Sequence, residues 1–221
     1  MKLLISIIIV TMVVSCNSGV VDKSASANTI KVDTFIIHDT IYIGEDHNPD
    51  WQSGFNLTHE PDKDSIWGKP VSYYLNDKEC VSIAFEFYHG YFRPSDNGAT
   101  DELLKYAATD NNKLRPFYRW CLNMTIQISD GALGEHVGVP ARQYAEKFPM
   151  EFFQYMDYDS TGEKYKEWIS AISYSGFYDG DDPEKPKEIR DRLIAKMKKN
   201  CNNCGDQIRK RIDKFAKDCF P

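Results

Sequence analysis

Over roughly the last two thirds of the chain, apolar residues recur every three or four positions, the period of an α-helix with one buried face. Val81, Ala84, Phe85 and Tyr88 form the first such pattern and predict a helix near residues 77–90. Seven further helices follow. From the third helix onward, the residues expected to face inward are Phe117, Trp120, Cys121, Met124 and Ile128, then Tyr144 and Phe148, then Phe152, Phe153 and Met156, then Tyr165, Trp168, Ile169 and Ile172, then Ile189, Leu193, Ala195 and Met197, and finally Ile208, Ile212, Phe215 and Ala216.

Capping residues and prolines predict where several helices begin. Thr100 is the expected N-cap of a short helix over Asp101–Thr109. Pro116 and Pro140 are expected at the first position of two helices, and Pro149 separates the second of these from the next. No fixed period of about 34 or 42 residues is found, so a regular solenoid is not expected. The predicted fold class is all-α, an irregular helical bundle or a short array of helix pairs.

The segment before the helices has a different composition. Residues 17–29 are small and polar, which is typical of a flexible tether. Residues 30–45 are rich in β-branched side chains, which favour extended structure. This part is expected to be a spacer or short hairpin, with an edge strand that recruits a partner as the alternative. The predicted organisation is an extended tether over 16–50 and a single helical domain over 51–221.

The first residues have the pattern of a targeting signal. Lys2 precedes an apolar run of 12 residues, too short for a transmembrane helix of about 20 residues but typical of a signal peptide. The run ends in Val-Val-Ser-Cys at Cys16, which resembles the lipobox of bacterial lipoproteins. The resemblance implies a signal peptide over 1–15 and lipidation of Cys16, and Asn17 after the cysteine implies the outer membrane. The alternative is an ordinary secretory signal with an incidental cysteine.

Charge is distributed unevenly along the chain. Residues 183–221 carry 12 Lys/Arg and 6 Asp/Glu, a net charge of +6, whereas residues 17–182 carry −13. Export argues against nucleic acid as the partner of the basic stretch. We expect that stretch to pack against the acidic body or to form solvated helix faces. Contact with anionic lipid or a polyanionic glycan is the alternative.

Five cysteines follow Cys16, an odd number for an oxidising compartment. Cys201 and Cys204 are expected to form a disulfide in a turn. If residues 206–220 form one helix, Cys204 and Cys219 lie about 22 Å apart, beyond the reach of a disulfide. Cys219 then pairs with Cys80 or Cys121, or stays free. A redox role for the Cys-x-x-Cys motif is disfavoured because no strand is predicted before it.

One segment resembles the front half of an EF-hand calcium loop. Its candidate ligands are Asp157, Asp159, Thr161 and Glu163. The bidentate glutamate expected at position twelve is replaced by Trp168, which puts calcium in doubt. The alternative is a capping box from Ser160 to Glu163 that starts a helix without metal. Asp179, Asp181 and Asp182 are likewise expected to form a turn and a helix cap, with a cation site as the alternative. No other cofactor is expected.

Two loops carry the candidate catalytic residues. Glu135 and His136 are expected in a loop between helices, and His89 in a second loop with aromatic residues and an arginine. If the loops met, the three side chains would form the general acid–base set of an envelope hydrolase. The alternative is that each belongs to an ordinary hydrogen-bonded loop. No histidine lies in a metal-hydrolase spacing.

The lipobox-like signal sequence and the lack of a strong catalytic motif together predict a membrane-anchored envelope lipoprotein that is not an enzyme. Its expected partner is a protein or an envelope polymer, besides the membrane that holds its lipid. An immunity or inhibitor protein that neutralises a basic toxin with its acidic body is one form of this hypothesis. The alternative is the envelope hydrolase that uses His89, Glu135 or His136.

Overall fold

A computed structural model of the chain describes residues 65–221. The predicted signal peptide, Cys16 and the tether over 16–50 therefore lie outside the described residues. The described part is all-α, as predicted, with one two-stranded hairpin. Its elements are β1 (Ser65–Ile66), β2 (Lys69–Pro70), α1 (Ser72–Leu75), α2 (Ser82–Tyr88), α3 (Gly98–Leu104), η3 (Lys105–Ala108), α4 (Arg115–Ile128), α5 (Gly131–Lys147), α6 (Pro149–Asp157), α7 (Glu163–Ser173), η4 (Tyr178–Gly180), α8 (Pro186–Lys199) and α9 (Asp206–Cys219).

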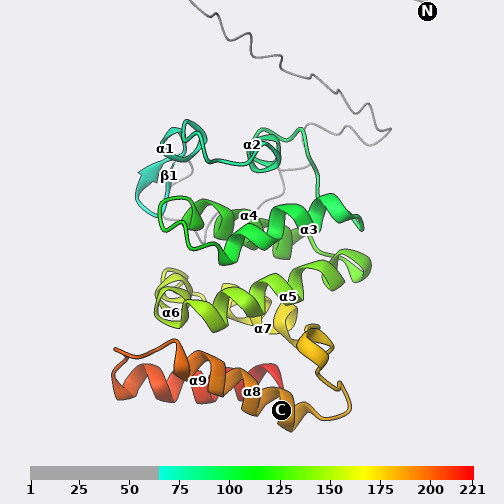
Figure 1. The fold of residues 1–221 in the computed structure, drawn as a ribbon, viewed down its shortest axis with the longest axis vertical. Helices are drawn as coiled ribbons and strands as arrows, with labels where there is room; N and C mark the ends of the chain where they lie inside the picture. Colours follow the sequence, from blue (N-terminus) through cyan, green and yellow to red (C-terminus); the bar gives the residue numbers. More distant parts are fainter. Residues whose placement is uncertain (1–64) are drawn as a thin grey trace, which may run out of the picture. The chain divides into compact units, whose positions relative to one another are not determined.

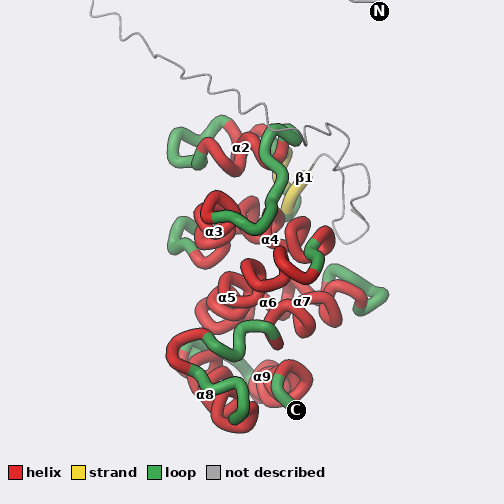
Figure 2. The backbone as a smooth tube through the Cα atoms, turned by 90° about the vertical axis from the view of Figure 1, so that its right-hand side faces the viewer, coloured by secondary structure: helices red, strands yellow, loops and turns green. Residues whose placement is uncertain are grey.

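The helices of this part are stacked in tiers (Figure 1). The hairpin, α1 and α2 form the first tier, and α3 and α4 form the second. The third tier contains α5, α6 and α7, and the antiparallel pair α8 and α9 forms the last (Figure 2). Helix α5 contacts α3, α4, α6, α7 and α8, so it joins the second, third and last tiers.

The core is built largely from the aromatic side chains that the helical spacing predicted. Trp120, Phe152, Phe153 and Trp168 are all buried, and each contacts at least one other ring. Helix α4 is buried on nearly every side, including its arginines. The prediction that Phe85 faces inward was wrong, because α2 lies at the edge of its tier and this ring is 43% exposed.

The prediction that a helix begins at Pro140 was wrong. Helix α5 begins two turns earlier, after Asp130, whose side chain caps it by accepting the Leu133 N–H at 3.1 Å. Pro140 lies inside α5, where it lacks the N–H that would bond the carbonyl of His136. Gly138 allows α5 to approach α7 closely, since a Cβ there would lie 2.7 Å from the carbonyl oxygen of Ala171.

Two other predicted helix starts are corrected by local hydrogen bonds. Asn97, rather than Thr100, caps α3, and its side chain accepts the N–H groups of Ala99 and Thr100 at 3.0 and 3.2 Å. The Thr100 hydroxyl donates instead to the Ser95 carbonyl at 2.6 Å. The expected helix near 77–90 is shorter, because α2 begins only at Ser82. None of the described helices is long and apolar enough to cross a membrane.

The hairpin turns tightly at Trp67 and Gly68. Both residues have positive φ, 53° and 71°, as a two-residue hairpin turn of type I′ requires. The left-handed conformation costs a non-glycine residue about 1–2 kcal/mol. The strand before the turn is held by Tyr74, whose hydroxyl donates to the Ile66 carbonyl at 2.7 Å. The turn thus fixes Trp67 against the body of the domain.

Candidate functional site

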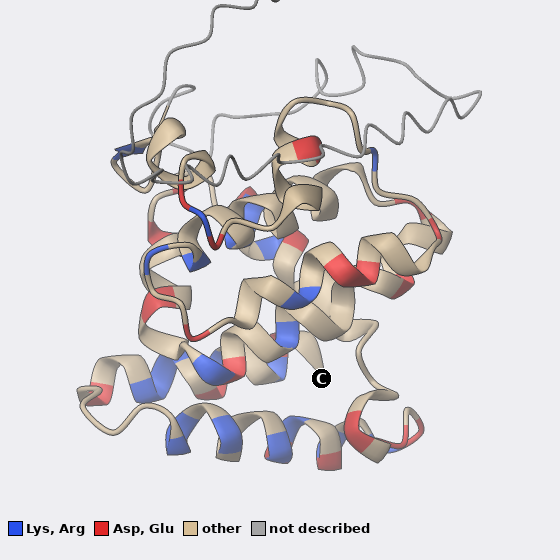
Figure 3. Cartoon of the chain, turned by 45° about the horizontal axis from the view of Figure 1, so that its top comes forward, with Lys and Arg blue, Asp and Glu red and all other residues tan. Residues whose placement is uncertain are grey.

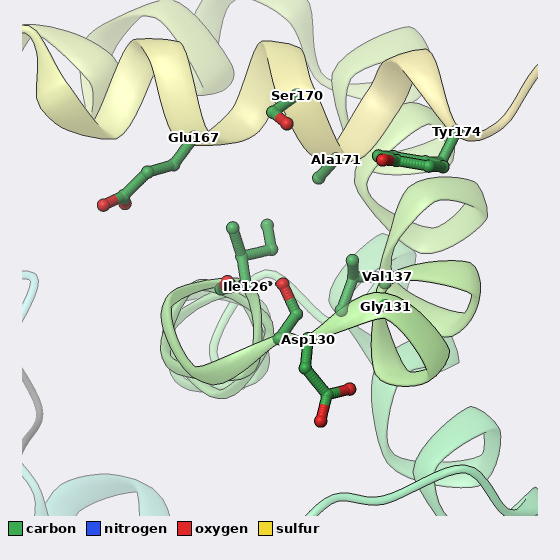
Figure 4. A pocket seen from close by; sticks show the side chains of 10 residues that line it. Ile126, Asp130, Gly131, Val137, Glu167, Ser170, Ala171 and Tyr174 are labelled. Carbon is green, nitrogen blue, oxygen red and sulfur yellow. Dashed lines mark hydrogen bonds between the residues drawn. The ribbon is translucent and has the colours of Figure 1, made fainter.

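A pocket of about 410 Å³ opens where the end of α4 meets the start of α5 and the length of α7. Figure 4 shows Glu167 and Tyr174 projecting from α7 across from Ile126 and Val137, while Asp130 turns its carboxylate away from α7. Its volume is within the range of small-molecule sites, about 300–1,000 Å³. The described residues that line it include two carboxylates and no lysine, arginine or histidine. This pocket is therefore suited to a neutral or cationic polar group.

His136 lies in helix α5 and not in the predicted loop. Its neighbours Gly134 and Val137 on this helix line the pocket. The Nδ1 of His136 lies 2.7 Å from Asp101 and its Nε2 lies 2.8 Å from Asp96. The hydrogen bonds to Asp101 and then to Asp96 raise the pKa of His136. Since both ring nitrogens have carboxylate partners, the protonated ring joins α3 to α5 as an ionic clamp. Neither nitrogen is left for a substrate proton in this arrangement.

The three catalytic candidates do not form one cluster in the described structure. His89 is exposed and packs against the rings of Phe85, Tyr88 and Tyr91, at centroid distances of 4.3, 5.2 and 6.0 Å. No hydrogen bond or ion pair of the described part joins it to Glu135 or His136. The condition for a shared acid–base set is therefore not met, and Glu135 and His136 belong to a helix rather than to the expected loop.

The calcium candidates are engaged by protein groups. Asp157 makes two hydrogen bonds to the guanidinium of Arg211, at 2.6 and 2.8 Å. Asp159 accepts the backbone N–H groups of Thr161 and Lys164 at 2.9 and 2.8 Å, so it orders the turn before α7. The N-cap of α7 is Gly162 rather than Ser160, which corrects the predicted capping box. Glu163 begins the helix. Within residues 65–221 no group of three metal-binding side chains is found.

The predicted disulfide between Cys201 and Cys204 is present, in the turn that joins α8 to α9. The other three cysteines of the described part, Cys80, Cys121 and Cys219, are free thiols. Burial raises the pKa of Cys121 and Cys219, and also that of the half-buried Cys80. These thiols therefore stay protonated near neutral pH, which disfavours nucleophilic chemistry at them.

The basic C-terminal helices pack against the acidic body, which was one of the two arrangements expected for them, the other being solvated helix faces. Lys and Arg positions, coloured blue in Figure 3, recur along α8 and α9. Several of them reach acidic residues that precede α8. The ion pairs that join the two parts are Arg192 with Asp181, Lys196 with Glu146 and Asp179, and Arg211 with Asp157. Part of the positive charge is therefore used inside the domain.

The sequence reasoning missed two completely buried arginines. Arg142 of α5 donates through Nε to Glu146 at 2.8 Å and through Nη1 to Asp181 at 2.5 Å. The side chain of Asp181 has no exposed surface and also pairs with Arg192. Asp181 is thus an internal ion-pair partner, where the sequence had predicted a turn and helix cap. Helical periodicity could not find it, because Arg142 falls among apolar positions that the pattern reads as core.

The second buried arginine is Arg119 of α4. Its Nη1 donates to the Tyr144 hydroxyl at 3.1 Å and to Glu151 at 3.2 Å. Tyr144 in turn donates to the same carboxylate at 2.9 Å, and burial raises the pKa of this phenol, so it remains a donor. Glu151 also pairs with Arg115 at 3.0 Å. A one-turn offset from Arg115 on one helix was the only available sequence signal.

Comparisons of the chain with protein-family models, with curated proteins and with solved structures found no match.

Proposed function

We propose that this chain is a lipid-anchored protein of the bacterial outer membrane whose helical domain binds a basic protein partner. The lipobox at Cys16 supports the anchor. Residues 16–50 would act as the tether. An inhibitor or immunity protein that neutralises a toxin is one form of this function.

The observation that carries the binding role is a cluster of four exposed carboxylates around the first turns of α5. We call it the acidic face, and it consists of Asp96, Asp101, Asp130 and Glu135. Two of these side chains, Asp96 and Asp101, are 71% and 62% exposed, although both contact His136. Their charge is thus available to a partner at the surface. The acidic pocket between α4, α5 and α7 adjoins the same turns.

Charge complementarity decides the kind of partner. Carboxylates that remain exposed attract a basic surface and speed its association, while they repel acidic molecules. Within residues 65–221, no Lys or Arg pairs with the acidic face, since the ion pairs of α8 and α9 go to Glu146, Asp157, Asp179 and Asp181 instead. A basic protein is therefore favoured over an anionic glycan.

The binding role is tested by crosslinked capture of partners from the native envelope with the full-length lipoprotein. The double variant Asp96→Lys/Glu135→Lys reverses part of the acidic face and leaves Asp101 with His136. Its matched control, Glu184→Lys/Asp191→Lys, reverses two exposed carboxylates near α8. We expect a stoichiometric basic partner that the first variant loses and the control keeps. Equal capture by both variants would contradict the acidic face.

The anchor is tested separately with Cys16→Ser. This variant lacks the sulfur that receives the lipid, so we expect it to leave the membrane fraction and to carry no fatty acid by mass spectrometry. A membrane-bound Cys16→Ser protein would remove the lipoprotein assignment and leave the acidic face untouched.

A further inference from the structure

The guanidinium of Arg119 packs against two aromatic rings, whose centres are 6.2 Å apart and whose planes meet at 62°. Its central carbon is 4.3 Å from the ring centre of Trp67 and 3.9 Å from that of Tyr155, and the side chain has no exposed surface. Cation–π contacts of this kind stabilise a desolvated arginine. They leave the N–H groups of the guanidinium to be matched by acceptors in its plane.

One edge of the Arg119 guanidinium has no acceptor among residues 65–221. Nη1 is used by Tyr144 and Glu151, whereas Nε and Nη2 have no hydrogen-bond partner in the described part of the chain. These two nitrogens form one side of the guanidinium fork, whose parallel N–H groups match the two oxygens of a carboxylate. Buried donors are nearly always paired, so a complete unpaired edge points to a ligand.

The charge around this edge is also unbalanced. Arg115 and Arg119 share the single carboxylate of Glu151. Arg115 is further satisfied by the Thr109 carbonyl at 3.0 Å, while Arg119 has no second carboxylate among the described residues. A buried cluster of two cations and one anion favours one more negative charge.

A path to the edge is available beside Trp67. A shallow depression of about 510 Å³ is lined by Trp67, Gln154, Asp157 and Tyr158. The negative charge of Asp157 is matched there by Arg211. Trp67 separates the depression from Arg119 and also packs on Tyr158, with ring centres 4.7 Å apart. Its left-handed backbone belongs to the tight hairpin turn that carries its ring to Arg119.

We propose that Arg119 is the centre of a binding site for a small organic carboxylate, with the Trp67 turn as its lid. The ligand enters from the depression and places its two oxygens in the plane of Nε and Nη2. The cluster carries one excess positive charge, which a single carboxylate balances, so a doubly charged phosphate or sulfate fits less well. This site needs neither the lipid anchor nor the acidic face.

The test titrates the full-length chain with acetate and succinate, and with phosphate for comparison, in a carboxylate-free buffer of constant ionic strength. Binding is followed by calorimetry and by the indole signal that Trp67→Phe removes. We expect saturable carboxylate binding that Arg119→Lys weakens by about tenfold or more, since lysine keeps the charge but loses the fork. Arg211→Lys, a matched change beside the same depression, should alter affinity less than about twofold.

The proposal is overturned if wild-type protein shows no saturable carboxylate binding, if Arg119→Lys and Arg211→Lys behave alike, or if phosphate binds more tightly than either acid. Should Arg119→Lys fail to fold, Trp67→Ala provides a second test that keeps the fork. Without the lid, carboxylates should associate faster by stopped-flow fluorescence of the remaining tryptophans or by NMR exchange. An unchanged association rate would contradict the lid.

Discussion

Arg119 and Arg142 are both completely buried, yet their surroundings differ. Arg142 uses Nε and Nη1, has Glu146 and Asp181 as carboxylate partners, and shares the second of these with Arg192. Arg119 uses Nη1 alone and shares Glu151 with Arg115. The first cluster joins α5, α8 and the loop between α7 and α8, whereas the second lies under a strained turn beside an open depression. The two arginines are therefore equally buried but differ in role: Arg142 is structural, and Arg119 is suited to a ligand.

The largest effect is expected from breaking the first cluster. Asp181→Ala removes a fully buried carboxylate that pairs with both Arg142 and Arg192. Removal of one partner from a buried ion pair costs about 3–5 kcal/mol. Guanidinium chloride unfolding measures this loss, and Asp182→Ala is the matched control because its side chain is 45% exposed. A loss no greater than that of the control would refute the structural role.

Arg119→Met sharpens the comparison. The change removes two hydrogen bonds and leaves Glu151 paired with Arg115, so we expect a loss of about 1–2 kcal/mol. Arg142→Met removes the buried partner of both Glu146 and Asp181, which keep only the partly exposed Lys196 and Arg192, so it should cost at least twice as much. Both variants are compared in the same unfolding experiment. If the two losses were equal, the difference between the clusters would have no energetic meaning.

The turn next to the Arg142 cluster is also fixed covalently. Replacing Cys201 and Cys204 by serine removes a crosslink of only four residues, for which loop-closure entropy predicts a loss of about 2 kcal/mol. Urea unfolding of the double variant measures it, with a reduced wild-type sample as the reference. A loss larger than that of Asp181→Ala would mean that the disulfide, and not the ion pairs, holds α8 and α9 in place.

The His136 clamp adds a smaller, pH-dependent contribution that neither arginine can supply. Its pKa is raised in the folded chain by Asp101 and Asp96, so the protonated clamp stabilises the fold fully below the unfolded pKa of about 6.5. This contribution is lost as the pH rises through the higher folded pKa. Unfolding curves between about pH 5.5 and 8.5 should show the decline, and His136→Gln should flatten it. A decline that persists in the variant would exclude the clamp as its cause.

Some features of the fold followed from neighbouring residues in the sequence. The spacing of Phe152, Phe153, Trp168 and Phe215 predicted which helix faces are buried, and all four residues are in the core. The Cys201–Cys204 disulfide also followed, since three residues of separation bring the two within bonding distance in a turn. These predictions succeeded because helical periodicity and short turns depend on contacts within a few residues.

Other features were decided only by the tertiary structure. Pro140 fits inside α5, where Gly138 packs against α7, and this moved Glu135 and His136 from the expected loop into a helix. The partners of the buried arginines are often far along the chain, as Arg142 is 39 residues from Asp181.

The sequence alone therefore determined the all-α class, the apolar helix faces and the local disulfide, because each depends on near neighbours. The tertiary structure decided which charged side chains are buried and which of them lack partners. A polar residue in the core is stable only beside a hydrogen-bonding partner, and where that partner is distant along the chain only the folded structure sets the distance.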